Sequence, residues 1–485
     1  MYISLFIFVL VFNRPRKEMY RSLKIFPFLL LAVLLNNCAV NNVPTAQSLV
    51  IKLNLSPNAR HVKNFHGFGT EWDSREYIGN KITDKDFELT KERIRYMKLP
   101  IVRTMMLARW CYDSTGVYRW NSPMMKQLYR ILDFCEENNI AVMLCEWGIE
   151  PGWDWMRLGG GIKKVDDPRY AEIIGNYMDY LLNTKKYTCI KYFILVNEPN
   201  YEVGNFTRWM KGVQNVHDEF VKKGIDKKII FAGSGQTWNE EWHYKTVDSL
   251  SNIINTYTIH RYESTSDLKN GRLFDYIRSQ LKYIRQNDST DSRKELIVSE
   301  AGMRDGMSVK KNINIDSFYY GVFMADYAIQ ATVAGSSSVL AWMLEDNSLP
   351  DFQYGLWADR FHEMKFRPWF YTWSLLTRYF PRGSEVYNLH PRSINQRAMA
   401  AKININGIDN WSVCLVNEDQ EPVLIKIKLP DNKANDFKIF YYTEESQKVD
   451  KNGFPLPVEN RQINISEGTD IQMPGNSVVI MTTLD

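Results

Sequence analysis

The sequence YFILVNEPN, residues 192–200, shows how this chain is organised. Apolar and aromatic residues run without alternation into an Asn-Glu pair, and the proline that follows lacks the N–H donor that a continuing strand needs. A strand buried on both faces loses its polar alternation, so the pattern predicts a buried parallel strand that ends in the carboxylate of Glu198. Because Glu198 by itself could equally be a solvated loop residue, its role depends on the other strands.

Other apolar runs of strand length recur along the chain, and together with Tyr192–Glu198 they number eight. The others are Gly67–Trp72, Ile101–Leu107, Ala141–Trp147, Ile229–Ser234, Asn255–Tyr262, Glu295–Glu300 and Val339–Leu344. Amphipathic helical patterns lie between them, over Ser122–Asn138, Pro168–Leu182, Phe206–Lys222 and Asp316–Ala331. This alternation predicts an α/β fold, a closed (β/α)8 or TIM barrel over residues 66–382. An open doubly wound sheet is the competing architecture, but the chain has no glycine-rich phosphate fingerprint after a strand to support it.

The pattern changes after Gly383, where short alternating runs are separated by Asn, Asp, Gly and Pro turns. These runs are Ala398–Ile405, Trp411–Val416, Val423–Leu429, Phe437–Tyr442 and Ser477–Thr483. They predict an all-β sandwich domain over residues 383–485. The alternating segment Leu49–Leu55 precedes the barrel, and since an isolated strand needs a partner edge, we expect residues 49–65 to join this sandwich.

Residues 1–48 have the pattern of a targeting segment and a linker. A short basic region after Met19 is followed by the apolar run Ile25–Leu35 and then by Cys38, which resembles a bacterial lipoprotein signal. The run is too short for a comfortable membrane span. We therefore expect an exported protein whose Cys38 is lipidated, with the lipid as its membrane attachment; plain export with cleavage nearby is the alternative.

Composition and cysteine usage narrow the function classes. The net charge of +4, from 60 basic and 56 acidic residues, is too balanced to indicate a nucleic-acid partner. The five cysteines other than Cys38 are irregularly spaced and predict no disulfide framework; Cys135 and Cys145 lie in apolar contexts typical of inert core thiols. The chain has neither a CxxC nor an HExxH motif, so we expect no catalytic metal and no cofactor.

Polar residues stand at the carboxyl ends of the predicted barrel strands, where the active sites of such barrels lie. They are Arg103, Asn197, Glu198, His260, Tyr262, Glu300 and Trp342. A buried guanidinium must find a carboxylate, for which Glu300 is the expected partner of Arg103 and Glu71 the alternative. Glycoside hydrolysis needs two facing carboxyl groups, one to protonate the departing oxygen and one, ionised, at the anomeric carbon. We expect Arg103 and Tyr262 to keep Glu300 ionised, and a less polar environment to keep Glu198 protonated.

This set of residues, in this order, resembles clan A of the retaining glycoside hydrolases over about residues 66–380. The His-x-Tyr element is similar to family 5, although that family has a histidine where this chain has Cys145-Glu146-Trp147. The opening Gly67-Phe68-Gly69 and the sandwich are similar to families 30 and 39. The resemblance implies that Glu198 is the acid/base and Glu300 the nucleophile.

The resemblance also implies roles for the neighbours of the two carboxylates. Arg103 and Tyr262 match residues that hold the nucleophile, and Asn197 matches a contact to the sugar 2-hydroxyl. Trp342 matches the aromatic platform under the reacting sugar. His260 is either a substrate contact or a buried structural imidazole. Trp147, together with Trp110, Trp153 and Trp155, is a candidate for a stacking wall.

The expected protein is thus a retaining glycoside hydrolase acting on a poly- or oligosaccharide. Two alternatives use the same barrel. A carbohydrate-binding protein without activity would be expected to lack one of the two glutamates. A transglycosylase would keep both, and would differ only in whether water or a sugar takes over the covalent intermediate.

Overall fold

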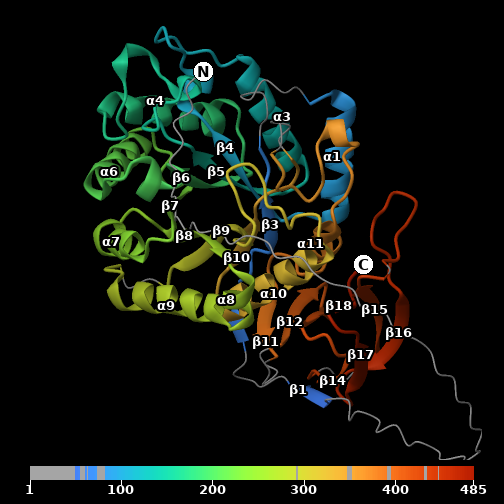
Figure 1. Ribbon diagram of the computed structural model, residues 1–485. Helices are drawn as coiled ribbons and strands as arrows, with labels where there is room; N and C mark the ends of the chain where they lie inside the picture. The colour runs from blue at the N-terminus through green and yellow to red at the C-terminus, as the bar shows by residue number, and fades with distance from the viewer. Residues whose placement is uncertain are drawn as a thin grey trace, which may run out of the picture. The chain divides into compact units, whose positions relative to one another are not determined.

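Eight parallel strands close into a barrel in the middle of the chain (Figure 1). They are β3 (Phe68–Glu71), β4 (Ile101–Met106), β5 (Ala141–Glu146), β6 (Ile190–Leu195), β7 (Ile230–Thr237), β8 (Thr256–Glu263), β9 (Glu295–Met303) and β10 (Ser338–Ala341). Neighbours in sequence are neighbours in the barrel, and the last strand pairs with the first through Val339 and Phe68. The predicted (β/α)8 barrel is confirmed, and this last pairing excludes the open sheet.

The computed structural model describes residues 50–54, 60–62, 64–73, 82–290, 293–346, 352–389, 395–430, 434–445 and 447–485. The expected signal segment and Cys38 lie outside these residues. None of the helices in the described ranges combines the length and the apolar character needed to cross a membrane.

The helices are α1 (Asp84–Met97), α2 (Ala108–Cys111), α3 (Pro123–Glu137), α4 (Pro168–Asp179), α5 (Pro199–Glu202), α6 (Phe206–Lys222), α7 (Glu240–Leu250), α8 (Thr265–Lys269), α9 (Arg272–Asn287), α10 (Phe318–Ala334) and α11 (Pro368–Tyr379). Local signals explain several of their starts. The Ser122 hydroxyl caps α3, which has Pro123 in its first turn, and the Asn205 side chain caps α6. The predicted segment 206–222 is helical over its full length.

Helix α10 differs from the amphipathic helix that the sequence predicted. It is buried along nearly its whole length, because it packs against β9 and β10 of the barrel and also against β12 and β13 of the following sheet. A helix between two layers has no solvent face, so its sequence is apolar all round.

The barrel interior follows the two-residue period of its strands. Ile101 and Met105 of β4 point inward and pack with Met143 and Cys145 of β5. Arg103 lies between Ile101 and Met105 in β4, so the same period directs its guanidinium into the barrel. A charge in this position requires partners, which the mouth of the barrel supplies.

Two sheets form the C-terminal part. The larger has the order β16-β15-β18-β13-β12-β11-β2, and the smaller the order β1-β14-β17. Their strands are β1 (Val50–Asn54), β2 (Arg60–Val62), β11 (Glu385–Asn388), β12 (Gln396–Ile405), β13 (Ile408–Asn417), β14 (Val423–Lys428), β15 (Ala434–Tyr442), β16 (Glu459–Asn464), β17 (Thr469–Met473) and β18 (Ser477–Thr482). β1 pairs with β14 and β2 with β11, so the segment before the barrel supplies a strand to each sheet.

Alternate residues of the larger sheet serve two cores. Val413 and Leu415 face the smaller sheet, whereas Cys414 and Val416 belong to the core that includes the barrel helices. The sheet is therefore buried on both faces and ties the sandwich to the barrel. Strands β11, β16 and β17 were not predicted from the sequence. They are short, and in β16 and β17 exposed polar residues alternate with less exposed ones.

Candidate active site

The guanidinium of Arg103 is the centre of a buried polar cluster at the mouth of the barrel. Nη1 donates to Glu71 Oε2 at 3.1 Å and to Glu300 Oε2 at 3.0 Å. Nη2 donates to Asn197 Oδ1 and, at 3.5 Å, to the sulfur of Cys145. Burial opposes its charge, but Cys145, Glu71 and Glu300 outweigh this effect and raise the pKa of Arg103. The expected partner and its alternative both contact the arginine, and Cys145 is part of the cluster rather than only a core thiol.

One arginine thus faces two carboxyl groups. Burial raises the pKa of Glu71 well above its ordinary value, and the charge of Arg103 opposes this rise without cancelling it. A neutral Glu71 beside an ionised Glu300 and a charged Arg103 leaves the three groups with no net charge. We therefore assign a proton to Glu71, which balances the charge of the cluster.

Glu300, on β9, is held by donors on both of its oxygens. Oε2 accepts from Arg103 and Oε1 accepts from the Tyr262 hydroxyl. Burial and the charge of Glu300 raise the pKa of Tyr262, so the phenol keeps its proton and donates it. His260 and Tyr262 lie two residues apart on β8 and reach the same side of the strand, as the sequence predicted. These bonds stabilise the ionised carboxylate of Glu300 and fix its orientation.

Glu198 follows β6 through a strained segment of backbone. Val196 has a φ of 72°, in the left-handed region that β-branched residues rarely adopt, and its N–H donates to Glu146 O at 2.9 Å. Such conformations persist where the surroundings impose them, often at functional sites. This turn brings Asn197 and Glu198 to the barrel mouth. Burial raises the pKa of Glu198 to about 7, and the charge of Arg103 works against the rise.

The two glutamates face each other across His260. Its Nδ1 lies 2.9 Å from Glu198 Oε1 and 3.4 Å from Glu300 Oε2, and one carboxylate oxygen of each glutamate lies within 4.8 Å of the other. Burial lowers the pKa of His260 to about 3, so the imidazole is neutral. We assign its proton to Nδ1, where it faces two acceptors, because Nε2 is buried and has no hydrogen-bond acceptor in the described residues.

Glu202 is a member of the site that the sequence analysis missed. Its Oε1 accepts from Trp147 Nε1 at 2.9 Å and from Asn197 Nδ2 at 3.2 Å, and its Oε2 accepts from the backbone N–H of Glu198 at 3.2 Å. Burial raises the pKa of Glu202 to about 8. The feature of the sequence that could have revealed Glu202 is its spacing: it lies four residues after Glu198, which places it one helical turn away on α5. Glu202 links three predicted site residues into one unit.

The tryptophans fall into different environments. Trp342, directly after β10, is half-buried against the barrel interior, with its ring centroid 6.5 Å from that of Phe352. Trp147 is half-buried, Trp110 is a core residue, and Trp153 is 47% exposed. The predicted stacking wall is therefore divided, and Trp110 does not contribute a surface to it.

Within the described residues, one group of side chains has ligand atoms close enough together to hold a metal ion: Glu198, His260 and Glu300. The oxygens of Glu300 already accept from Arg103 and Tyr262. A metal ion would have to displace these donors and lie beside the guanidinium charge. The donor set fits a hydrogen-bonded pair of carboxyl groups better than a metal centre.

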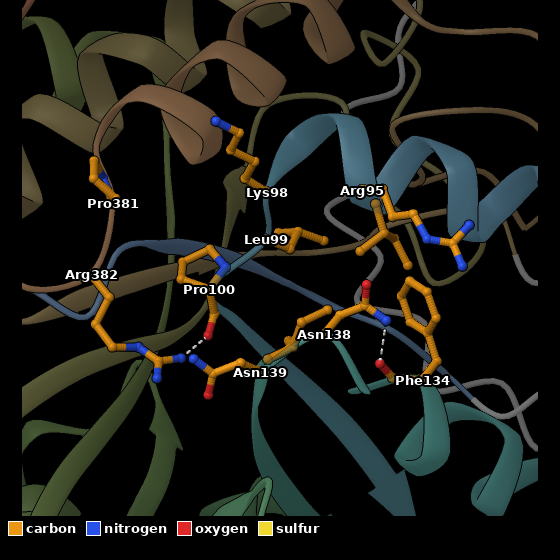
Figure 2. A pocket seen from close by; sticks show the side chains of 11 residues that line it. Arg95, Lys98, Leu99, Pro100, Phe134, Asn138, Asn139, Pro381 and Arg382 are labelled. Carbon is orange, nitrogen blue, oxygen red and sulfur yellow. Dashed lines mark hydrogen bonds between the residues drawn. The ribbon is translucent and has the colours of Figure 1, made fainter. Parts of the chain in front are cut away.

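A cavity of about 540 Å³ lies at the opposite end of the barrel, next to the residues that lead into β4 and β5 (Figure 2). Its lining residues are Ile94, Arg95, Lys98, Leu99, Pro100, Phe134, Asn138, Asn139, Ile140, Pro381 and Arg382. Arg382 is turned to the carbonyl of Pro100, and Asn138 donates to Phe134 O at 2.8 Å. Its lining has no carboxyl side chain, so this cavity cannot supply the pair of carboxyl groups that glycoside hydrolysis needs.

No family model and no curated protein sequence matches this chain. Several solved structures, however, have a similar fold. A glycoside hydrolase family 30 endoxylanase from Clostridium papyrosolvens has a TM-score of 0.64 at 12% identity, covering 90% of this chain and 100% of its own. An α-L-arabinofuranosidase from Thermotoga maritima has a TM-score of 0.63 at 12% identity, with coverages of 90% and 99%.

A family 39 glycoside hydrolase from Bacteroides cellulosilyticus is similar with a TM-score of 0.59 at 13% identity, covering 86% of this chain and 81% of its own. At sequence identities this low, structural similarity establishes the fold alone. The activity has to be inferred from the chemistry of the site. The expected resemblance to clan A is confirmed at that level: the chain has the barrel-and-sandwich fold of family 30, family 39 and related glycoside hydrolases.

Proposed function

We propose that this protein is a retaining glycoside hydrolase that cleaves O-glycosidic bonds of an oligo- or polysaccharide. The observation that carries the proposal is the pair Glu198 and Glu300, which have one oxygen each within 4.8 Å of the other. Retaining enzymes place their two carboxyl groups ~5–5.5 Å apart, whereas inverting enzymes need ~6.5–9.5 Å to admit a water molecule. An oxygen–oxygen distance under 4.8 Å is compatible with the closer, retaining arrangement.

The different surroundings of the two groups support different roles. Glu300 accepts from Arg103 and Tyr262, so it is the ionised group that attacks the anomeric carbon and forms a covalent glycosyl-enzyme. Glu198, whose pKa is raised to about 7, holds the proton that passes to the departing glycosidic oxygen. In the second step Glu198 takes a proton from water, the resulting hydroxide attacks the same carbon, and Glu300 is released.

The other predicted site residues fit this scheme. Arg103 and Tyr262 orient the nucleophile, and neutral His260 bridges both carboxyl groups. Asn197, held between Arg103 and Glu202, is the proposed contact to the 2-hydroxyl, and half-buried Trp342 the proposed platform for the reacting sugar. Trp147, which shares Glu202 with Asn197, is proposed to contact the substrate beside it.

Active-site variants test this assignment. Activity is first sought on a panel of aryl glycosides and on xylan, β-glucan and arabinofuranosides, because structural neighbours include endoxylanases, a bifunctional glucanase-xylanase and an arabinofuranosidase. Glu300→Gln is expected to abolish turnover. Glu198→Ala is expected to lose activity and to regain it with azide, which replaces water in the second step. Unimpaired activity in either variant would refute the assignment.

Product analysis separates the proposal from its alternatives. NMR of the first product should show the anomeric configuration of the substrate; the opposite anomer would indicate inversion. Products longer than the substrate would indicate a transglycosylase. Binding without turnover of any panel member would indicate a carbohydrate-binding protein.

We further propose that the protein is exported and held at a bacterial membrane by lipid on Cys38. The apolar run before Cys38 supports this proposal. Cells labelled with a palmitate analogue should incorporate the label into the unchanged protein and not into Cys38→Ser. Equal labelling of both would exclude Cys38 as the lipidated residue.

A further inference from the structure

The short helix α8, Thr265–Lys269, follows the strand that carries His260 and Tyr262. β8 ends at Glu263, and α8 begins two residues later. Isolated helices shorter than ~12 residues are marginal in water, so a helix of five residues depends on its surroundings. The side chains that bind α8 therefore set its position, and with it the position of the strand end before it.

The first contacts to α8 come from the loop after β9, the strand of the proposed nucleophile. Arg304 Nη2 donates to Asp267 Oδ2 at 2.9 Å, and the N–H of Thr265 donates to Asp305 Oδ2 at 2.7 Å. The N–H of Arg304 also donates to Glu263 O at 2.8 Å. The start of α8 is thus joined to the ends of both β8 and β9.

The second contacts come from α10, which lies beside α8 (Figure 1). Gln330 Nε2 donates to Leu268 O, near the end of α8, at 2.8 Å. One turn earlier in α10, the Tyr327 hydroxyl donates to Arg261 O at 2.8 Å. Arg261 stands between the two site residues of β8, so this bond holds the backbone that carries them. α10 therefore binds both the helix and the strand end.

The third contact comes from the sandwich, through Arg397 of β12. Its Nη2 donates to the carbonyl of Lys269, the last residue of α8, at 2.8 Å. Its Nε lies 3.4 Å from Asp326 Oδ1 of α10. Asp326 is fully buried and also accepts from Gln330 Nε2 at 3.0 Å. One guanidinium of the sandwich thus binds α8 and α10 at the same time.

The surroundings of Arg397 fix its position. Burial raises the pKa of Asp326 and that of Glu418, and in both cases the charge of Arg397 opposes the rise. Glu418 is 5% exposed, and its Oε1 accepts from the Tyr319 hydroxyl at 3.1 Å. A guanidinium beside two buried carboxyl groups cannot move away without leaving them unpaired, which is costly. Arg397 is therefore a rigid attachment point for α8.

We propose that Arg397 is a positioning residue for the active site: by holding α8, it fixes the end of β8 and so the side chains of His260 and Tyr262. The proposal rests on the proposed function, in which Tyr262 orients the nucleophile and His260 bridges the two carboxyl groups. Misplacing reacting groups by about 1 Å can lower a rate about a hundredfold, so a remote contact of this kind is measurable in kcat. The sandwich thereby contributes to catalysis without touching the substrate.

The test measures kcat and KM on the most active substrate of the panel above, per folded protein as judged by circular dichroism. Arg397→Met is expected to lower kcat about tenfold and to leave KM within about twofold, because the reacting groups are misplaced while the substrate still binds. Arg397→Lys keeps the charge and can reach the Lys269 carbonyl, so it should recover most of the loss. Tyr327→Phe removes only the bond to β8 and should lower kcat about threefold.

A matched control removes a different bond between the sandwich and α10. The Tyr442 hydroxyl of β15 donates to Phe318 O, at the start of α10, at 2.8 Å. This contact does not reach α8, so Tyr442→Phe should keep the kcat of the unchanged protein. An equal loss in Tyr442→Phe and Arg397→Met would show that any weakening of the interface has this effect, which would overturn the positioning role.

Hydrogen exchange of backbone amides supplies a readout that does not depend on activity. In Arg397→Met the amides of residues 256–269 should exchange faster, whereas those of β6 should not. If Arg397→Met does not fold, the double variant Asp326→Asn with Arg397→Met removes the unpaired charge of Asp326 and is measured in its place.

Unchanged exchange of residues 256–269, or a rise in KM at unchanged kcat, would overturn the positioning role and leave the proposed function standing. If the unchanged protein turns over no glycoside of the panel, the proposed function fails and the positioning role fails with it.

Discussion

The proton assigned to Glu71 makes a quantitative prediction about stability. Glu71 is 1% exposed, and burial raises its pKa well above the unfolded value even though Arg103 lies 3.1 Å away. A glutamine at this position is close in shape to a protonated carboxyl group. We therefore expect Glu71→Gln to fold and to be nearly as stable as the unchanged protein at pH 5.

The difference between the two proteins should grow as the pH rises. Between the unfolded and the folded pKa, native Glu71 keeps a proton that the unfolded chain has lost. The unchanged protein consequently loses stability with rising pH, by ~1.4 kcal/mol per pH unit for this one group. The loss begins above the unfolded pKa and ends at the folded pKa. For each pH unit within that window, Glu71→Gln should gain ~1.4 kcal/mol relative to the unchanged protein.

The measurement is a series of urea unfolding curves at pH 5.5, 6.5 and 7.5 for both proteins. Other buried carboxyl groups with raised pKa values, such as those of Glu146 and Glu202, add the same slope to both proteins and cancel in the difference. Parallel stability profiles would refute the reasoning, because they would mean that Glu71 is ionised in the folded state. In that case Arg103 would be shared by two negative charges.

Three further predictions concern the site itself. Because Glu198 must carry a proton to act as the acid, kcat/KM should fall about tenfold per pH unit above a pKa of about 7; a profile flat to pH 9 would contradict that role. Arg103→Met leaves buried carboxyl groups without their cation and should lower the free energy of unfolding by about 3–5 kcal/mol, as measured by denaturant unfolding; a change below 1 kcal/mol would show that the cluster is not stabilising. Glu202→Ala removes the acceptor of Asn197 and Trp147 and should reduce kcat/KM about tenfold or more on every substrate, with an unchanged circular dichroism spectrum as the control. Wild-type activity of that variant would show that the three residues do not need Glu202.

The barrel could be predicted from the sequence because several of its strands, such as β5 and β6, contain a short apolar run, a local pattern that the burial of both faces imposes. The same pattern indicated the order of the polar strand ends, and the closed barrel brings Arg103, Glu198, His260, Tyr262 and Glu300 together at one mouth. Topology accounts for this success: in a barrel of parallel strands, all carboxyl ends meet at the same rim.

Other features depend on neighbours that are distant in sequence. The raised pKa of Glu71 results from its burial, which the charge of the shared Arg103 offsets only in part, and neither effect can be read from local composition. The burial of α10 on two sides depends on the layers that pack against it. The short, polar strands β16 and β17 likewise depend on the strands that they pair with.

The opening stretch, residues 192–200, illustrates the division. Its sequence determined a buried strand that delivers Asn197 and Glu198, because hydrophobic patterning is a property of consecutive residues. Only the tertiary structure decided that Val196 turns through a left-handed conformation, that His260 joins Glu198 to Glu300, and that Asn200 fastens the next loop. Hydrogen bonds and pKa values depend on distances of a few ångströms between separate strands, and closing the barrel sets those distances.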